Sequence, residues 1–524
     1  MRSRHLAGLV LASALITLDG TATTVALPAI GRDLSASVAR LQWIANAPLL
    51  VLAALLLPAG TLADRSGRDR LIRLGLFIFA AASIACSTAR VDYVVIAAKL
   101  AQGAGGALIL PSCLAILRGA YSDTAQRTRV FGLWAAWTGA ASAAGPLLAG
   151  AIVDFVSWRG VFLLPAAAAA AALLLLRRDV PIALPARHVP LPLVGLVGLM
   201  LLLGSVAYAL MLAAEAAPTP ARLAWPVVLT LVSGILLARD PQRAVLFPRE
   251  LVVARNCIPA NATTFAFYFG LFGVTFLVVL YVQQVLRYSA IWAAILVLPI
   301  SLMLLLAEPL GRLTRVCGMR WLIVAGAIFA AAGVGWTGSR PHPVPWSHIL
   351  LGTAVFGLGI SLAVTALTHA AVAAVPETHA GAASGLNHAV VRIAGLVAVA
   401  LLGSIAAPGV SDVVSGEGVQ RALIVCACVV GGGGVCGGLL LRDEAPGGLA
   451  RAERGFRLAP AGGLSTALPL FATFVAGRRR SPRRRAGAAP RGARAALDPS
   501  ASPPACSRTA AVERRRRTRA HPPR

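Results

Sequence analysis

Fourteen runs of apolar residues, most of them long enough to cross a lipid bilayer, follow one another along this chain. A spanning helix needs about 20 mostly apolar residues, because each residue adds about 1.5 Å and the hydrocarbon core is about 30 Å thick. The runs lie near residues 6–30, 41–63, 71–89, 93–118, 128–153, 160–176, 190–214, 222–238, 259–286, 290–310, 321–338, 347–373, 383–407 and 419–441. The sequence therefore predicts an all-α integral membrane protein with fourteen spans.

Composition supports this fold class and weighs against other functions. Hydrophobic residues make up 58% of the 524 residues and charged residues only 13%, too few to cover a water-soluble surface of this size. The eight cysteines form no Cys-x-x-Cys pair and have no histidines at ligand spacing, so we expect neither a disulfide framework nor a metal site. Since no nucleophile–base pair or phosphate-binding loop stands out either, we do not expect an enzyme.

The distribution of arginine predicts how the spans are oriented. With the N-terminus inside the cell, the cytoplasmic ends and loops before residue 442 hold 19 arginines and the external loops hold eight. Arginine and lysine gather on the cytoplasmic side of membrane proteins. We therefore expect a multi-pass protein of the plasma membrane with both termini in the cytoplasm.

A short polar stretch separates the second and third apolar runs. It holds Gly60, Asp64, Arg65, Gly67 and Arg68. The glycines allow close backbone approach, and Asp64 lies where it could face a helix N-terminus or an arginine. The stretch resembles the G-x-L-x-D-R-x-G-R loop between helices two and three of the major facilitator superfamily. That resemblance implies that these five residues form a cytoplasmic gate.

The same pattern recurs later in the chain. Gly311-Arg-Leu-Thr-Arg-Val-Cys-Gly318 stands 251 residues after the stretch that begins at Gly60, although Arg315 replaces the acid. Repeated halves with a binding site between them are typical of secondary transporters. We expect a major-facilitator fold of two six-helix bundles, residues 1–178 and 246–441. Residues 179–245 would add two central transmembrane helices, and the arginine-rich segment 442–524 would be a disordered cytoplasmic tail.

Asp19 and Lys99 stand inside apolar runs, where a charge is costly and normally has a use. Asp19 stands near the middle of the first run, in a stretch that resembles the L-D-x-T-x-x-x-x-A-L-P motif of the fourteen-span drug:proton antiporters. Lys99 takes the place of arginine in that family's R-x-x-Q-G-x-G-x-A motif. The resemblance implies that both residues couple transport to protons. Asp19 could instead balance a cationic cargo or be satisfied by threonines, and Lys99 could pair with Asp19 or reach an interface.

The fifth run holds Gly145, Pro146 and Gly150. This part resembles the antiporter motif G-x-x-x-G-P-x-x-G-G, with alanine at two glycine positions. Small residues allow helices to pack closely, and proline bends a helix. The resemblance favours a proton-driven exporter over an importer.

The sequence predicts a secondary active transporter that exports small amphipathic drugs or antibiotics in exchange for protons by alternating access, with no cofactor besides the proton gradient. The alternatives are a facilitator or proton symporter for a specific metabolite, and a non-transporting membrane receptor. We expect a small-molecule substrate, protons and the lipid bilayer as partners, with no dedicated nucleic-acid partner. Candidate cargo contacts are the polar or aromatic residues Trp43, Asn46, Gln102, Trp134, Trp137, Tyr268 and Asn387.

Overall fold

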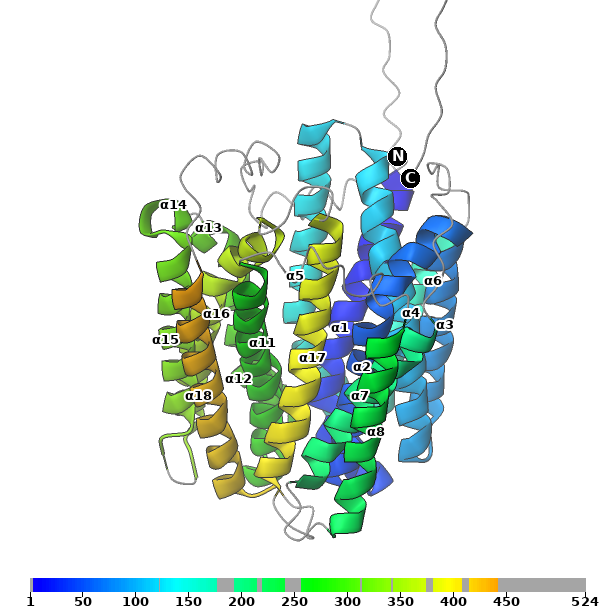
Figure 1. Ribbon diagram of the computed structural model, residues 1–524. Coiled ribbons are helices and arrows are strands. Elements are labelled where there is room, and N and C mark those ends of the chain that lie inside the picture. Colours follow the sequence, from blue (N-terminus) through cyan, green and yellow to red (C-terminus); the bar gives the residue numbers. More distant parts are fainter. Residues whose placement is uncertain are drawn as a thin grey trace, which may run out of the picture. The chain divides into compact units, whose positions relative to one another are not determined.

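The computed structural model describes residues 3–121, 123–176, 193–213, 219–240, 256–311, 313–340, 343–373, 380–407 and 414–441. The chain divides into two compact units, residues 1–475 and 476–524, and all described residues lie in the first. Within the described residues the regular structure is entirely helical, with no strand (Figure 1). The predicted all-α fold class is therefore confirmed. The predicted disordered tail lies outside the described residues.

The first six helices pack on one another as one bundle. They are α1 (Ser3–Leu34), α2 (Val38–Ser66), α3 (Arg68–Thr88), α4 (Asp92–Ala120), α5 (Thr124–Phe155) and α6 (Trp158–Leu175). Helix α1 contacts α5 and α6, while α4 contacts α2 and α3. Helix α4 buries Gly103, Gly105 and Gly106, and two of these glycines lie at backbone distance from α2 and α3, which lets the helix axes approach closely. We call these six helices the front bundle.

The back bundle is built from the later helices. They are α11 (Cys257–Leu280) with its π-helical extension η1 (Tyr281–Val285), α12 (Ala290–Leu304), α13 (Ala307–Gly311), α14 (Thr314–Cys317), α15 (Met319–Thr337), α16 (Trp346–Ala373), α17 (Ala380–Ala406) and α18 (Gly416–Leu440). Helices α15 and α16 pack closely together, and α11 contacts both α17 and α18. The two bundles meet along α2 with α17 and along α5 with α12.

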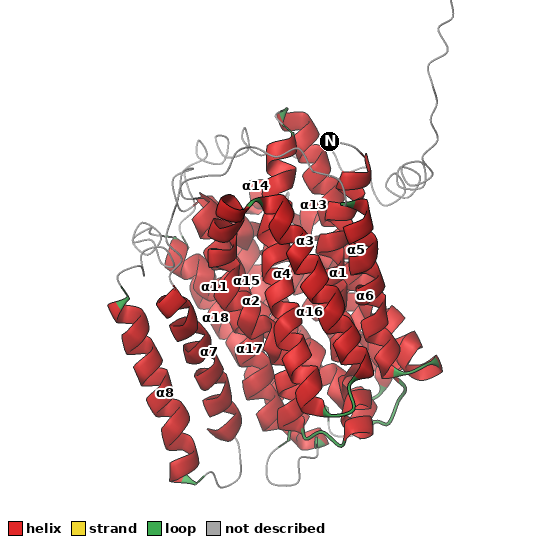
Figure 2. Cartoon of the chain, turned by 90° about the vertical axis from the view of Figure 1, so that its right-hand side faces the viewer, coloured by secondary structure: helices red, strands yellow, loops and turns green. Residues whose placement is uncertain are grey.

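The two helices between the bundles in sequence lie at the side of the assembly in space. Helix α7 (Leu193–Ala213) packs on α8 (Pro220–Arg239) and also contacts α2 and α17. Figure 2 shows the pair beside the other helices, with α8 outermost. The hydroxyls of Ser205 and Thr230 join the pair at 2.8 Å. The helices are thus central in the sequence only, and the predicted boundaries near 178, 245 and 442 fall outside the described residues.

Each of the fourteen predicted runs coincides with a helix. In the described part of the chain, eleven helices are long and apolar enough to cross a membrane. Three further apolar stretches are shorter: Val197–Leu210, Ala224–Arg239 and Ala290–Leu304. The helical character of the runs is confirmed, whereas the count of fourteen spans stays a prediction.

The internal repeat is visible in the backbone. Gly67 (φ 89°) and Gly318 (φ 80°) are the two glycines with positive φ in the described residues, and they stand 251 positions apart. Each ends one helix and begins the next, α3 or α15. At the same spacing, Gly75 and Gly326 lie where a Cβ atom would approach a carbonyl oxygen of the next long helix, α4 or α16, at 2.7 Å. The second copy therefore keeps the turn and the close helix crossing although it lacks the acid.

Candidate functional site

A cavity of about 230 Å³ lies between the two bundles. Residues of α1, α2, α4 and α5 line one side, and residues of α11, α12 and α17 line the other. The α1 side is rich in hydroxyl groups, while α11 and α12 contribute mostly apolar side chains such as Phe272, Phe276 and Ile300. Lys99 and Arg392 bring charge to the lining. The cavity is therefore amphipathic and is shared by both halves of the molecule.

The structure brings the two predicted coupling residues together at this cavity. Lys99 Nζ lies 2.7 Å from Asp19 Oδ2 and also donates a hydrogen bond of 3.0 Å to Thr23 Oγ1. Only 1% of the Lys99 side chain and 6% of the Asp19 side chain are exposed. The alternative in which Lys99 pairs with Asp19 thus describes this structure. Their role in proton coupling stays a prediction.

Polar and aromatic neighbours complete the environment of this pair. Gln102 Nε2 donates to Asp19 Oδ1 at 3.3 Å and to Ser83 Oγ at 2.7 Å. The Lys99 ammonium also lies 5.5 Å from the centre of the Phe162 ring, within range of a cation–π interaction. Gln102 was expected to contact cargo, and here it holds the carboxylate in place from α4.

The residues of the antiporter-like motif place α5 between α1 and α12. A Cβ atom at Gly145 would lie 3.1 Å from the carbonyl oxygen of Leu18 on α1 and would collide with the Thr21 hydroxyl. A Cβ atom at Gly150 would lie 2.8 Å from Ile291 Cα on α12. Pro146 lines the cavity. These small residues therefore let α5 touch one helix of each bundle at backbone distance.

Hydrogen bonds join the two bundles at the end opposite the N-terminus. Gln42 Nε2 on α2 donates to the carbonyl oxygens of Val399 and Ala400 on α17, each at 2.9 Å. Gln283 Nε2 donates to Val25 O at 2.9 Å. The Asp154 carboxylate accepts the first backbone N–H groups of α12, from Ala290 at 3.0 Å and Ile291 at 2.8 Å. This end of the interface is closed.

Three tryptophans that were expected to contact cargo pack within helix clusters. The Trp43 ring lies 6.4 Å from the Tyr208 ring, so it helps to seat α7 on α2. Trp134 packs 6.5 Å from Phe131, and both Trp134 and Trp137 lie against the buried residues of the front bundle. None of the three is among the described residues that line the cavity.

The remaining predicted cargo contacts are also away from the lining. Asn387 Nδ2 donates to Thr264 Oγ1 at 3.0 Å and to Asn261 Oδ1 at 3.3 Å, which joins α17 to α11. Tyr268 lies on α11 and interacts electrostatically with Arg392. Asn46 is fully buried on α2, and its amide has no hydrogen-bond partner among the described residues. A role of these residues in cargo binding stays a prediction.

The structure describes some of the residues of the predicted cytoplasmic gate. Gly60, Asp64 and Arg65 lie in the last turns of α2, and their side chains are outside the described part of the structure. Gly67 supplies the turn into α3, and Arg68 Nη1 donates to the carbonyl oxygen of Ala115 on α4 at 3.4 Å. The latter contact fixes the start of α3 to α4. The gating role itself stays a prediction.

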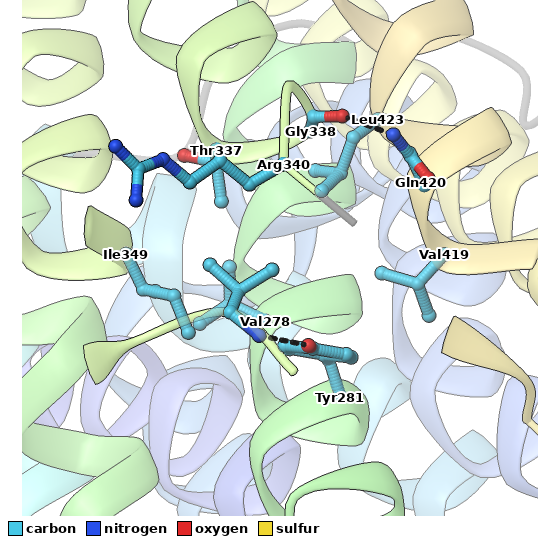
Figure 3. A pocket seen from close by; sticks show the side chains of 10 residues that line it. Val278, Tyr281, Thr337, Gly338, Arg340, Ile349, Val419, Gln420 and Leu423 are labelled. Atoms are coloured by element: carbon cyan, nitrogen blue, oxygen red, sulfur yellow. Dashed lines mark hydrogen bonds between the residues drawn. The ribbon is translucent and has the colours of Figure 1, made fainter. Parts of the chain in front are cut away.

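A second hollow, near the ends of α15 and α18, is too small for cargo. Its volume is about 10 Å³, room for about one water molecule. Figure 3 shows the contacts beside it, where Tyr281 Oη accepts a hydrogen bond from the Val344 backbone N–H and Gln420 donates to Gly338 O. These bonds tie the segment between α15 and α16 to its neighbours.

Sequence reasoning left several cavity residues out of the candidate site. Thr17, Thr21 and Thr24 on α1 all line the cavity, and their spacing of four and three residues puts them on one helix face. That periodicity is a signal in the sequence. Arg392 offers another, because it is a basic residue inside an apolar run.

Comparisons with known proteins agree with this architecture. A family model described as Major Facilitator Superfamily matches residues 9–399. The chain is 29% identical over 425 residues to the methylenomycin A resistance protein of Streptomyces coelicolor, covering 80% of this chain and 88% of that protein. It is 30% identical over 436 residues to the puromycin resistance protein pur8 of Streptomyces alboniger, covering 80% of this chain and 85% of that protein.

Solved structures show the same fold. A crystal structure of the peptide transporter POT in complex with sulfate matches with a TM-score of 0.60 at 17% sequence identity, covering 87% of this chain and 96% of that one. At this identity the likeness concerns the fold alone.

Proposed function

The chain belongs to the major facilitator superfamily, and we propose that it exports small amphipathic drugs or antibiotics across the plasma membrane in exchange for protons. Relatives that match most of this chain are named as resistance proteins for methylenomycin A and puromycin. An amphipathic cavity between two bundles is what a secondary transporter needs for cargo that has both apolar and polar parts. As a carrier of this kind it needs no cofactor, since the proton gradient supplies the energy.

The observation that carries the proposal is the buried pair of Asp19 and Lys99 at the cavity. A proton that binds Asp19 cancels its charge and removes the electrostatic attraction that holds Lys99. Protonation therefore changes the charge and the hydrogen bonding at the wall where the bundles meet. This gives a proton a means to favour one arrangement of the bundles over another.

The contacts between the bundles support alternating access. Gln42, Gln283 and Asp154 close the interface at the end opposite the N-terminus. Opening at that end requires these bonds to break while the other end closes. With both termini in the cytoplasm, as the arginine distribution predicts, the end that these bonds close would face outward.

Transport by purified protein in liposomes tests the proposal. An imposed pH gradient should drive a fluorescent amphipathic drug against its own gradient, with protons moving in the opposite direction. The Asp19→Asn variant should lose the pH-driven movement, and its thermal unfolding is measured alongside because Lys99 is left without its counter-charge. Asp33→Asn is a matched control, because Asp33 lies on the same helix with 45% of its side chain exposed.

Two outcomes would contradict the proposal. Proton-coupled transport at the normal rate by Asp19→Asn would remove Asp19 from the mechanism. Movement of cargo without any proton counterflow would instead favour a facilitator.

A further inference from the structure

Arg392 is a positive charge at the cavity without a negative partner. It lies on α17 in the back bundle and lines the cavity. Among the side chains that the structure describes, no carboxylate forms an ion pair with it, and its recorded neighbours are the phenol of Tyr268 and the imidazole of His388. An unpaired cation inside a membrane protein is costly and normally marks a site for an ion or a ligand.

The other charges at the cavity cancel each other. Lys99 lines the cavity, but its ammonium is bound to the Asp19 carboxylate at 2.7 Å. Asp19 is therefore already neutralised by the protein, and it has no free negative charge to offer a cationic cargo. Among the described residues that line the cavity, what remains is the positive charge of Arg392 on the opposite wall.

The surroundings of Arg392 suit a molecule with an apolar body. One turn along α17, a Cβ atom at Gly395 would lie 2.8 Å from the Phe272 ring on α11, so this ring packs beside the arginine's helix. Phe272 also lines the cavity, together with Leu271 and Phe276 from the same helix. A ligand held at Arg392 would thus rest its apolar part on α11.

We propose that Arg392 binds an anionic group, such as a carboxylate, of an amphipathic cargo whose apolar part packs against α11. A guanidinium group offers several N–H donors in a plane and matches a carboxylate in a two-bond geometry. This inference rests on the proposed export function and deepens it. It makes amphipathic anions, rather than cations, the preferred class of substrate.

An anionic cargo also changes the electrical charge moved in each cycle. Exchange of one proton inward for one neutral molecule outward moves one charge, whereas exchange for one monoanion moves two. The membrane potential acts on each charge that crosses. The rate of export of an anion should therefore depend on the membrane potential more steeply than the rate for its neutral analogue.

Equilibrium binding to the purified full chain tests the site directly. The probes are 2-naphthoate, which is anionic at neutral pH, and 2-naphthamide, which has nearly the same shape without the charge. Calorimetry should show that the wild-type protein binds naphthoate more tightly. Arg392→Gln should weaken naphthoate binding roughly 10- to 100-fold, the value of one or two charge-assisted hydrogen bonds, and leave naphthamide binding unchanged.

Two further variants show whether the loss of binding in Arg392→Gln comes from the lost charge or from a folding defect. Arg392→Lys keeps the positive charge and should keep the preference for naphthoate, with lower affinity because the planar geometry is lost. Arg421→Gln is the matched control, since Arg421 lies on α18 with 68% of its side chain exposed. The inference is overturned if the wild-type protein does not bind naphthoate, if it binds naphthamide equally well, or if Arg392→Gln weakens both probes alike.

The test separates this inference from the export function itself. Binding is measured without a pH gradient and therefore does not depend on Asp19 acting as a proton carrier. If Arg392→Gln binds naphthoate normally while the wild-type protein still exchanges the fluorescent drug for protons, the anion site is wrong and the export function stands. If anion binding depends on Arg392 but no cargo moves with protons, the anion site stands and the proton-coupled export function is wrong.

Discussion

Lys99 and Asp19 form an ion pair across α4 and α1, with 2.7 Å between Nζ and Oδ2. Almost none of either side chain is exposed. Thr23 and Gln102 add hydrogen bonds to the two charges. Each charge is thus tolerated because the other is present, and the pair fixes α4 against α1 beside the cavity.

Removal of Lys99 alone should destabilise the protein. In Lys99→Met, the Asp19 carboxylate keeps its buried position and loses its counter-charge, which costs about 3–5 kcal/mol in comparable buried pairs. Unfolding of the purified protein in detergent, followed by heat or denaturant, measures this change. The exposed pair of Arg421 and Glu417 gives the comparison, because 68% and 80% of the two side chains are exposed and Arg421→Met should cost less.

A double variant separates stability from coupling. Asp19→Asn combined with Lys99→Met removes both charges and should recover most of the lost stability, since no charge is left unpaired. It should still lack pH-driven export. A Lys99→Met protein as stable as the wild type would show that the pair does not hold the two helices together.

The sequence predicts which segments are helical far better than which way each helix faces. Long apolar runs fix the helices, because a backbone in lipid must satisfy its own hydrogen bonds. In a soluble protein the polar face of a helix marks its outer side. A membrane helix faces lipid that is as apolar as its packed side, so the pattern does not reveal which residues point inward. The sequence accordingly places Trp43, Trp134 and Asn387 at the cavity, whereas none of them is among the described residues that line it.

Pairing across the chain is a second property that the sequence leaves open. Asp19 and Lys99 each stand out as a charge in an apolar run, yet 80 residues separate them and several partners were possible. The position of α7 and α8 is a similar case. Their place between two repeated halves of the sequence suggests a central location, but packing against α2 and α17 puts them at the side.

Gly150 should be sensitive to the smallest added side chain. In Gly150→Ala, the new Cβ atom would lie 2.8 Å from Ile291 Cα, so α5 and α12 must separate. Overpacking of this kind costs about 1–3 kcal/mol. We expect the closed end of the interface to loosen and export to fall by roughly tenfold. Drug export from cells at matched expression measures the effect.

Gly132→Ala is the control on the same helix, because a Cβ atom at Gly132 has nothing within 4 Å. It should export normally and unfold at or slightly above the wild-type temperature, since alanine favours helix more than glycine does. If Gly150→Ala and Gly132→Ala showed the same drug export and the same unfolding temperature, α5 and α12 would not be held at backbone distance.

The two repeated turns should respond alike to substitution. Gly67 and Gly318 both have positive φ, which costs other residues about 1–3 kcal/mol. We expect Gly67→Ala and Gly318→Ala each to lower stability by an amount in this range, as measured by thermal unfolding. Gly335→Ala on α15 is the control, because Gly335 is helical and has nothing within 4 Å of its Cβ position. A loss at Gly67 alone would show that the second copy of the repeat has no structural role.

Asp154 should control the closed end of the interface. Its carboxylate accepts the backbone N–H groups of Ala290 and Ile291 at the start of α12, where the helix dipole also favours a negative charge. Asp154→Ala removes these bonds and should favour opening at this end by about 1 kcal/mol, the usual value of such a cap. Distances between spin labels on exposed positions of α5 and α12 would report the shift.

Asp154→Asn provides a graded comparison, because asparagine keeps an acceptor oxygen but loses the charge. It should fall between the wild type and Asp154→Ala in the fraction of open molecules. Both variants should keep the pair of Asp19 and Lys99 intact and therefore remain coupled to protons, with an altered rate of export rather than a loss of pH dependence. Unchanged label distances in Asp154→Ala would show that the contacts of Gln42 and Gln283 suffice to close this end.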